Sequence, residues 1–512
     1  MSSSSHEFDD EAEIDLVADQ YAAESASMTP EERTARSDDL KQQGNTYFKE
    51  KQYHKAAYFY SCALIFTPSN EVLFSNRAQC RLKLEEYGSA LHDADAAIQC
   101  NPNFVKGHYR KGCALMAMTR YKEAAQAFAK IKTDAEARKH YDTCSKLYKE
   151  ALFAAAIASD MTSMPVEKIS LGNLVLPVSY DGPAFAPSTI YDPSRPHEKY
   201  TPELLDWILE AFQDLKTNRV PRSLVHAILF DVYNTLRVLP SLVDVPIPAE
   251  TKITVCGDTH GQYYDVLNIF KLFGKPSASN PYLFNGDFVD RGSFSYELAV
   301  MLLLAKLVYP EHVHLSRGNH ESTNMNNVYG FKGEVLAKAD QFTFDVFTDV
   351  FNALPLAHCL NQRVLVLHGG LFEDNSVTLD DIRKTQRFRQ PPEKGVMCDA
   401  LWSDPGARAG RNPPHRGCGV VFGPDVTKAF LDRNNLSLLV RSHEMKQEGY
   451  SVDHDGKCIT VFSAPNYCDQ MGNKGAVLIF NSACEYEVKQ FSAVPHPNVP
   501  AMKFANQMMR FG

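Results

Sequence analysis

The stretch GDFVDRG (286–292) follows the short apolar run PYLF (281–284) after the single residue Asn285, and this arrangement indicates the fold of the second half of the chain. Four further polar segments also follow apolar runs: CGDTHG (256–261), RGNHES (317–322), HGG (368–370) and RSHE (441–444). Short apolar runs separated by helical stretches predict an α/β arrangement. Because the loops after strand C-termini form the site in such sheets, we expect these five segments to converge.

These loops supply carboxylate, amide and imidazole groups, and none of the expected ligands is a thiolate. Six such ligands exceed what one tetrahedral site uses, so we expect two divalent metal ions that share a carboxylate and lie roughly 3.5–4 Å apart. Sites of oxygen and nitrogen accept Mn, Fe, Zn or Mg, and the sequence does not choose among them. The expected ligands are Asp258, His260, Asp287, Asn319, His368 and His443.

Together with SAPNYCDQMGN (463–473), these segments resemble the metal-dependent phosphoprotein phosphatase family. The resemblance implies an α/β calcineurin-like metallophosphoesterase domain, a β-sandwich flanked by helices, with protein-serine/threonine phosphatase activity. It also implies that Asp287 bridges the two metals. Asp258 and His260 complete the first metal site, and the second is completed by Asn319, His368 and His443.

The resemblance further implies how phosphoserine and phosphothreonine are hydrolysed, by in-line attack of a hydroxide shared by the two metals. Arg291 and Arg416 are the expected phosphate-gripping residues, since a planar guanidinium suits phosphate oxygens better than an ammonium does. His320 is the expected general acid, and Asp290 should orient it. The implied substrate-binding set is Arg291, Asn319, His320, Arg416 and Tyr467.

The first third of the chain contains an internal repeat of 34 residues, over 37–70, 71–104 and 105–138. Small residues recur at one offset as Gly44, Ala78 and Gly112, which is what two closely crossing helices need, and Pro68 and Pro102 close the first two units. The pattern resembles the tetratricopeptide repeat. The expected fold is therefore multidomain, an all-α tetratricopeptide repeat solenoid followed by the phosphoesterase domain.

A set of basic and amide side chains falls on the first helix of each repeat, the helix that lines the groove of such arrays. Pairs four residues apart share a helix face. The set resembles the carboxylate clamp of tetratricopeptide co-chaperones, which implies binding of the C-terminal EEVD tail of heat-shock protein 90 through charge-assisted hydrogen bonds. The clamp residues are Lys41, Asn45, Asn76, Lys106 and Arg110.

The excess acidity lies at the N-terminus, because the formal charge is −9 and residues 1–32 hold ten acids without Lys or Arg. In the Pro-rich segment that follows the repeats, Leu171, Leu174, Val175 and Leu176 are too apolar to stay solvated, so we expect them to lie against the next domain. The expected organisation is an acidic disordered tail (1–36), three repeats (37–138), a helical extension and linker (139–200), the catalytic domain (201–495) and a C-terminal autoinhibitory helix segment (496–512).

Self-inhibition is a further implication of the resemblance to phosphatases that carry tetratricopeptide repeats. In these enzymes the repeat domain covers the catalytic cleft and a C-terminal helix holds it there. Glu85 matches the residue that reaches toward the active site, where a carboxylate competes with substrate phosphate. The segment AMKFANQMMRF (501–511) is Met-rich and suits a weak, releasable helix contact. A chaperone tail or an acidic lipid would release the enzyme by binding the open state.

Other features exclude whole classes of protein. The N-terminus has no secretory signal pattern, and the apolar stretch near 299–308 is interrupted by Lys306 and too short for a membrane span. Twelve scattered Cys fit reduced thiols, so we expect a cytoplasmic protein, with the nucleus as a second location. The catalytic half has no basic run, which disfavours a nucleic acid partner.

Two alternatives compete with the phosphatase interpretation. A phosphodiesterase of the same superfamily commonly ends its motifs with a GHxH segment, but here the corresponding residues are RSHE (441–444). A catalytically inactive chaperone-binding adaptor would usually have lost a metal ligand or a phosphate arginine, whereas this sequence keeps them all.

Overall fold

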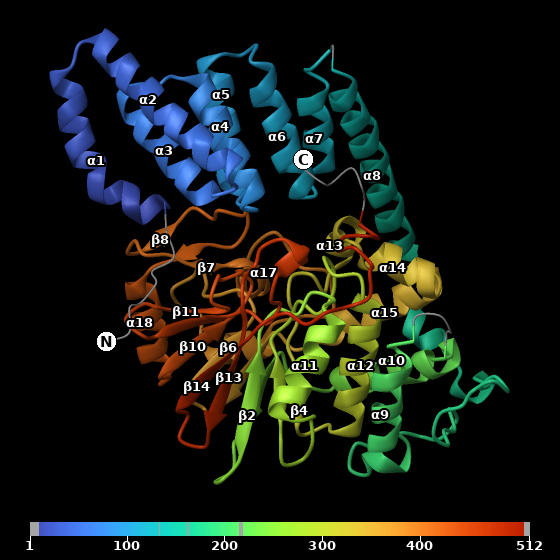
Figure 1. Ribbon diagram of the computed structural model, residues 1–512. Coiled ribbons are helices and arrows are strands. Elements are labelled where there is room, and N and C mark those ends of the chain that lie inside the picture. Colours follow the sequence, from blue (N-terminus) through green and yellow to red (C-terminus); the bar gives the residue numbers. More distant parts are fainter. Residues whose placement is uncertain (1–9, 133, 161–162, 215–218, 506–512) are drawn as a thin grey trace. The chain divides into compact units, whose positions relative to one another are not determined.

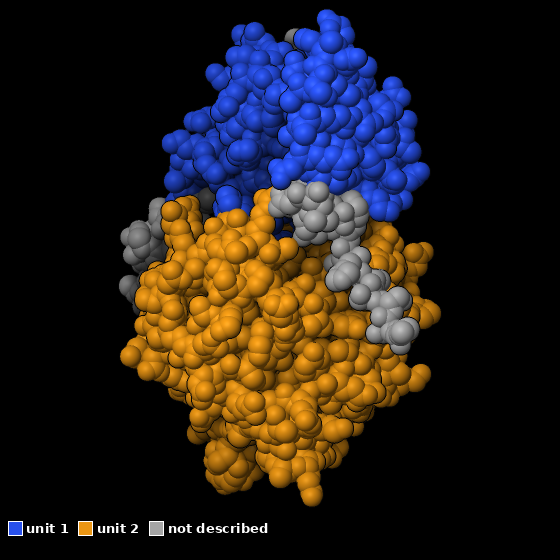
Figure 2. Space-filling view, turned by 90° about the vertical axis from the view of Figure 1, so that its left-hand side faces the viewer, with its two compact units in different colours: residues 1–161, 413–418, 508–512 blue, residues 162–412, 419–507 orange. Residues whose placement is uncertain are grey.

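The computed structural model describes residues 10–132, 134–160, 163–214 and 219–505, which divide into two compact units (Figures 1 and 2). Among these residues, unit 1 holds 10–160 and the short segment 413–418, and unit 2 holds 163–412 and 419–505. No helix in the described part of the chain is long and apolar enough to cross a bilayer.

The repeat region of unit 1 is helical, and consecutive helices pack as antiparallel pairs (Figure 1). Small residues stand where the helices of a pair cross, as the 34-residue period predicts. A Cβ on Gly44 would lie 2.7 Å from the Tyr60 ring, and one on Gly112 would lie 2.6 Å from the Phe128 ring. The helices are α1 (Asp10–Ser27), α2 (Pro30–Lys49), α3 (Tyr53–Phe66), α4 (Glu71–Lys83), α5 (Tyr87–Cys100), α6 (Val105–Ala117), α7 (Tyr121–Phe128) and α8 (Ala135–Asp160).

The prediction of a disordered tail over 1–36 is wrong from residue 10 onward, and residues 1–9 lie outside the described part. Helix α1 packs against α3, where the rings of Tyr21 and Phe66 have centroids 5.7 Å apart and the Arg36 guanidinium lies 5.8 Å from the Tyr21 ring. Helix α2 begins at Pro30, seven residues before the expected repeat boundary, because Thr29 and Glu32 form a capping box. The acidic N-terminal helix thus extends the solenoid by one helix.

Unit 2 is built around two sheets with the orders β1-β5-β6-β10-β12-β11 and β14-β13-β2-β3-β4, and a small sheet β7-β9-β8. Strands β2, β3 and β4 are parallel to one another, as are β6, β10 and β12. The strands are β1 (Leu242–Val245), β2 (Lys252–Cys256), β3 (Tyr282–Phe284), β4 (Val313–Leu315), β5 (Ala357–Leu360), β6 (Val364–Leu367), β7 (Asp404–Pro405), β8 (Arg411–Asn412), β9 (Val421–Phe422), β10 (Leu438–Arg441), β11 (Tyr450–Asp453), β12 (Cys458–Val461), β13 (Gly475–Asn481) and β14 (Tyr486–Phe491).

The two large sheets pack face to face, which confirms the expected β-sandwich. Val255 of β2 and Val366 of β6 share one buried cluster between the sheets. Their neighbours Cys256 and Leu367 point the other way, into clusters that involve the outer helices. This alternation follows from the two-residue period of a strand, and because both faces are covered the strands are apolar throughout.

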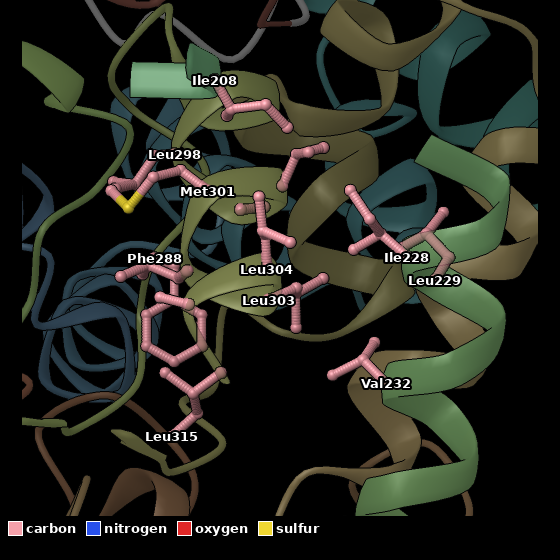
Figure 3. Packing of buried hydrophobic residues seen from close by; sticks show 14 of the residues in the cluster. Ile208, Ile228, Leu229, Val232, Phe288, Leu298, Met301, Leu303, Leu304 and Leu315 are labelled. Atoms are coloured by element: carbon pink, nitrogen blue, oxygen red, sulfur yellow. The ribbon is translucent and has the colours of Figure 1, made fainter. Parts of the chain in front are cut away.

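Helices cover the outer faces of the sandwich, and α12 is buried along its whole length. Figure 3 shows Leu298, Met301 and Leu304 of α12 in the same cluster as Ile228 of α10. The helices of unit 2 are α9 (Pro202–Ala211), α10 (Arg222–Leu236), α11 (Tyr263–Phe273), α12 (Ser295–Val308), α13 (Thr323–Tyr329), α14 (Phe331–Lys338), α15 (Gln341–Ala353), α16 (Leu379–Lys384), α17 (Val396–Trp402) and α18 (Pro424–Arg433), with short 3₁₀ turns η1 (Pro165–Lys168), η2 (Leu171–Asn173), η3 (Pro196–Glu198) and η4 (Tyr467–Asp469).

The catalytic unit begins earlier than the predicted boundary at 201. Val166 is buried in its core, and its N–H donates to Asp349 Oδ2 at 2.9 Å. Of the linker residues expected to pack, Leu171, Leu174 and Leu176 do so, whereas Val175 is 78% exposed. At the other end, the prediction of a helix over 496–512 is wrong for residues 496–505, which form turns and irregular structure without a helix. Residues 506–512 lie outside the described residues.

Candidate active site

Every expected metal ligand lies in a loop that follows a strand of the sandwich. Asp258 and His260 follow β2, Asp287 follows β3 and Asn319 follows β4, while the loops after β6 and β10 bring the remaining two from the other sheet. Since these strands run parallel within each sheet, their carboxyl ends meet at one edge. The six side chains are all buried there: Asp258, His260, Asp287, Asn319, His368 and His443.

Asp287 occupies the middle of this cluster. Its Oδ2 lies 3.6 Å from His260 Nε2 and 3.4 Å from His368 Nε2. On the His368 side, Nε2 is 2.8 Å from Asn319 Oδ1 and 3.2 Å from His443 Nδ1. One carboxylate therefore faces two groups of nitrogen and oxygen atoms, one on each side.

Backbone carbonyls fix the protonation of two of these imidazoles. His260 Nδ1 lies 3.0 Å from Val289 O, and His368 Nδ1 lies 2.9 Å from Asn285 O. A carbonyl can only accept, so each Nδ1 carries the proton and each Nε2 presents a lone pair to the cluster. Burial lowers the pKa of both rings, which keeps them neutral.

The donor set fits divalent cations. His368 Nε2 presents its lone pair to Asp287 Oδ2 at 3.4 Å, a contact between acceptors that is unfavourable without a cation, and His443 Nδ1 lies 3.2 Å from the same Nε2. Ligand atoms at about 2.0–2.2 Å from a metal stand roughly 3–3.5 Å apart, as these do. Two groups of described residues can hold an ion, His260 with Asp287 and His320, and Asp287 with His368 and His443.

Asp258 also belongs to the site, although it is in neither of those groups. Its Oδ2 is 3.6 Å from His260 Nε2, and its Oδ1 is 3.7 Å from His368 Nδ1 and accepts the His443 N–H at 3.0 Å. Burial raises the pKa of Asp258 to about 7, and a cation beside it would oppose that rise. These distances place Asp258 between His260 and His368, with its Oδ2 toward the ligand nitrogen of His260.

His320 differs from the other imidazoles in its partner. Its Nδ1 lies 2.8 Å from Asp290 Oδ2, and its ring is 4.8 Å from that of His260. Asp290 also accepts from Asn326 Nδ2 at 3.0 Å and from the Phe331 N–H at 2.8 Å, so both of its oxygens are held in place. A carboxylate against Nδ1 stabilises the doubly protonated ring, the form a general acid needs, whereas a carbonyl does not.

The structure fixes Arg291 from both sides. Its guanidinium carbon is 3.8 Å from the centroid of the Tyr329 ring, a cation–π contact. The backbone N–H of Arg291 donates to the backbone oxygen of Tyr329 at 3.0 Å. Tyr467 lies beside a metal ligand, with its ring 5.2 Å from that of His260. Arg416 belongs to the segment 413–418 that is grouped with unit 1, so its expected phosphate contact stays a prediction.

Two buried residues that support the ligand loops have no role in the sequence analysis. Glu321 accepts the N–H groups of Asp287, Phe288 and Gly318 at 2.7–2.8 Å. Arg441 donates to Asp404 Oδ1 at 2.6 Å and to Gly369 O at 2.7 Å, next to His368. Glu321 stands within RGNHES and Arg441 opens RSHE, but nothing in either motif marks them as supports.

The expected clamp residues lie on the first helices of the repeats in unit 1, α2, α4 and α6. Lys41 is paired with Asp38, and Asn45 Oδ1 accepts from the Tyr60 hydroxyl at 2.7 Å, so its amide nitrogen is the group that can donate to a ligand. Asn76 is half-buried and Lys106 is exposed.

Arg110 lies in a basic part of the groove. Burial lowers the pKa of Arg110, and among the described residues its buried Nε has no hydrogen-bond partner. Burial together with the charges of Arg110 and Lys51 lowers the pKa of Lys83, the last residue of α4, which has no role in the sequence analysis. Mutually repelling cations with an unmet donor favour binding of an anion. Glu85 adopts a left-handed turn after α4, with φ of 64°.

Comparison with known proteins agrees with this geometry. Residues 251–447 match the calcineurin-like phosphoesterase family, and residues 141–244 match the PPP5 TPR repeat region. Serine/threonine-protein phosphatase 5 of Homo sapiens is 46% identical over 93% of this chain and 94% of its own length. Serine/threonine-protein phosphatase T of Trypanosoma brucei brucei is 45% identical over 92% and 98%. A solved Saccharomyces cerevisiae serine/threonine phosphatase aligns with 58% of this chain and 99% of its own at 43% identity and a TM-score of 0.56.

Proposed function

The chain belongs to the serine/threonine-protein phosphatase 5 family and is a protein-serine/threonine phosphatase. We propose that it hydrolyses phosphoserine and phosphothreonine esters at a site for two divalent cations. The proposal rests on one observation above all, the position of Asp287 Oδ2 between His260 Nε2 and His368 Nε2. A carboxylate flanked in this way can hold two cations at once.

When bound, the two cations neutralise phosphate charge and make a water nucleophilic near neutral pH. The residues of the chain supply the remaining functions. Arg291, held against Tyr329, donates to the phosphate oxygens and orients the ester for in-line attack. His320 gives its Nε2 proton to the leaving serine or threonine oxygen, and Asp290 keeps the ring oriented and charged until it does so.

Two measurements on matched variants test the site, phosphate release from a phosphoserine peptide and bound metal by elemental analysis. Asp287→Asn should lose both activity and metal, whereas Asp455→Asn, at an exposed turn with φ of 53°, should lose neither. His320→Ala should lose peptide hydrolysis but keep its metal. Loss of metal in the His320 variant would make that histidine a ligand, and full activity in the Asp287 variant would refute the site.

We further propose that the groove of unit 1 binds the C-terminal EEVD tail of heat-shock protein 90. The basic surroundings of Arg110 and the five clamp positions support this. Calorimetry with an EEVD peptide should show that Lys106→Glu weakens binding at least a hundredfold, because it places like charges together. Lys122→Glu is the control, because Lys122 is exposed on α7, the second helix of the third repeat, and does not belong to the clamp. Equal affinity of both variants would remove the clamp.

Self-inhibition through Glu85 is proposed on family membership and stays untested by the geometry. The structure indicates which truncation tests it. A truncation at residue 175 would remove Val166 from the core of unit 2, so the repeat-free enzyme should begin at 162. We expect this enzyme, Glu85→Ala, and the full chain with EEVD peptide or anionic lipid vesicles to have higher kcat/KM than the full chain alone. A full chain as fast as the repeat-free enzyme would refute inhibition.

A further inference from the structure

The last described residues of the chain run across the loop that carries Arg291. We name residues 500–505 the C-terminal strap. The Met502 N–H donates to Arg291 O at 2.7 Å, so the strap is hydrogen-bonded to the backbone of the residue that we assign to phosphate binding.

Ser293 anchors the strap on either side of this contact. Its Oγ donates to Pro500 O at 2.7 Å and accepts from the Lys503 N–H at 3.3 Å. The far end of the strap is packed against α14. A Cβ on Gly333 would lie 2.5 Å from Phe504 O, and Ala505 is buried. The strap is therefore anchored on unit 2 near both of its ends.

The strap also reaches the loop that carries Tyr467. Asp469 Oδ2 accepts the Ala501 N–H at 3.2 Å, and its Oδ1 lies 3.0 Å from His496 Nε2. The strap thus joins two loops that follow different sheets, one with Arg291 and one with Tyr467 beside His260. The Arg291 loop lies between β3 and α12, and the Tyr467 loop holds only the short 3₁₀ turn η4.

We propose that the C-terminal strap is a positioning element for Arg291, acting through the hydrogen bond from the Met502 N–H. Arg291 has φ of 68°, in the left-handed region that a non-glycine residue adopts only when its surroundings hold it. Its N–H is held by Tyr329 O and its carbonyl by the strap, so the loss of either contact lets the guanidinium leave the phosphate position. This inference rests on the proposed role of Arg291.

The decisive comparison is made at position 502 of the full chain. Met502→Pro removes the N–H and cannot adopt the observed φ of 59°, whereas Met502→Gly keeps the N–H and accepts that φ. We expect Met502→Pro to lower kcat/KM for p-nitrophenyl phosphate and to raise the inhibition constant of inorganic phosphate, each about tenfold. Met502→Gly should change both by less than about threefold. Ser293→Ala keeps the strap sequence but removes the hydroxyl that bonds Pro500 and Lys503. It should change kcat/KM and the inhibition constant in the same direction as Met502→Pro.

A double-mutant cycle with Arg291→Ala separates positioning from general loosening. If the strap acts through Arg291, Met502→Pro should have almost no further effect in the Arg291→Ala background. Any release of self-inhibition would multiply both backgrounds by the same factor and drop out of the coupling. Equal losses in both backgrounds, or a glycine variant as weak as the proline one, would overturn the proposal. An Arg291→Ala enzyme as active as the wild type would instead refute the phosphate role of Arg291.

Discussion

Lys306 is a buried cation whose removal should stabilise unit 2. It lies in α12, is 4% exposed, and donates through Nζ to Pro310 O at 2.5 Å. Burial lowers its pKa from the ordinary 10.5 to about 8, with a small opposing effect of Glu311. The same residue that breaks the longest apolar run of the sequence therefore costs folding free energy.

The pH dependence of that cost follows from the two pKa values. The pKa of Lys306 is lower in the folded chain than in the unfolded chain. For this basic group the cost in folding free energy is therefore full below pH 8, declines as pH rises, and vanishes above the unfolded-state pKa of 10.5. At pH 7 it amounts to about 3 kcal/mol, and at pH 9.5 to about 1 kcal/mol. Lys306→Met also loses the hydrogen bond to Pro310 O, worth about 1 kcal/mol. The expected net stabilisation is about 2 kcal/mol at pH 7 and near zero at pH 9.5.

Urea unfolding followed by tryptophan fluorescence measures this effect. Both tryptophans, Trp207 and Trp402, lie in unit 2, so the signal reports that unit alone. Lys271→Met, at an exposed position of α11, is the control and should change stability little at either pH. A methionine variant at 306 that is less stable than wild type at both pH values would show that the buried ammonium is fully compensated, and would refute this reasoning.

Three further predictions concern the repeat, the acid and a ligand loop. Gly112→Val places a Cβ 2.6 Å from the Phe128 ring and should destabilise unit 1 by about 1–3 kcal/mol in thermal unfolding followed by circular dichroism, whereas Gly172→Val, in open space, should be neutral. His320→Ala should lower kcat about 10²–10⁴-fold on a phosphoserine peptide and much less on p-nitrophenyl phosphate, a better leaving group, so equal losses would contradict its role as the acid. In Glu321→Gln an amide NH₂ faces a backbone N–H whichever way the side-chain amide is oriented. This variant should bind metal about 10–100-fold more weakly in chelator competition, and an unchanged metal affinity would remove the supporting role of Glu321.

The sequence predicts much of this molecule because its strongest patterns are periodic. The 34-residue spacing places Gly44 and Gly112 against the rings of Tyr60 and Phe128, since two helices cannot cross closely over a larger side chain. Apolar runs followed by polar clusters likewise predict which strand ends carry ligands, and Asp287 lies where a shared carboxylate must lie.

The N-terminal helix α1 was not predictable from the charge pattern of the sequence. Ten acids in residues 1–32 suggest a solvated tail, yet the packing of α1 depends on a few contacts such as Tyr21 with Phe66. Thr29 and Glu32 mark the start of α2, because a capping box marks a helix start whatever the net charge of the segment, but they give no sign of α1. The net charge of residues 1–32 therefore does not decide whether the segment is helical, and the start of α2 can be found from its capping box.

The supporting contacts of the site could not be predicted, and the physical reason is the same for each. Glu321 and the C-terminal strap hold the ligand loops through backbone N–H groups, which every residue has and which therefore leave no signature in the sequence. A buried loop must satisfy those groups somewhere, and which segment does so is decided only when distant parts of the chain meet. The residues that do the chemistry of this site can thus be found by pattern, whereas the residues that hold Asp287 and Arg291 in left-handed turns can be found only in the folded chain.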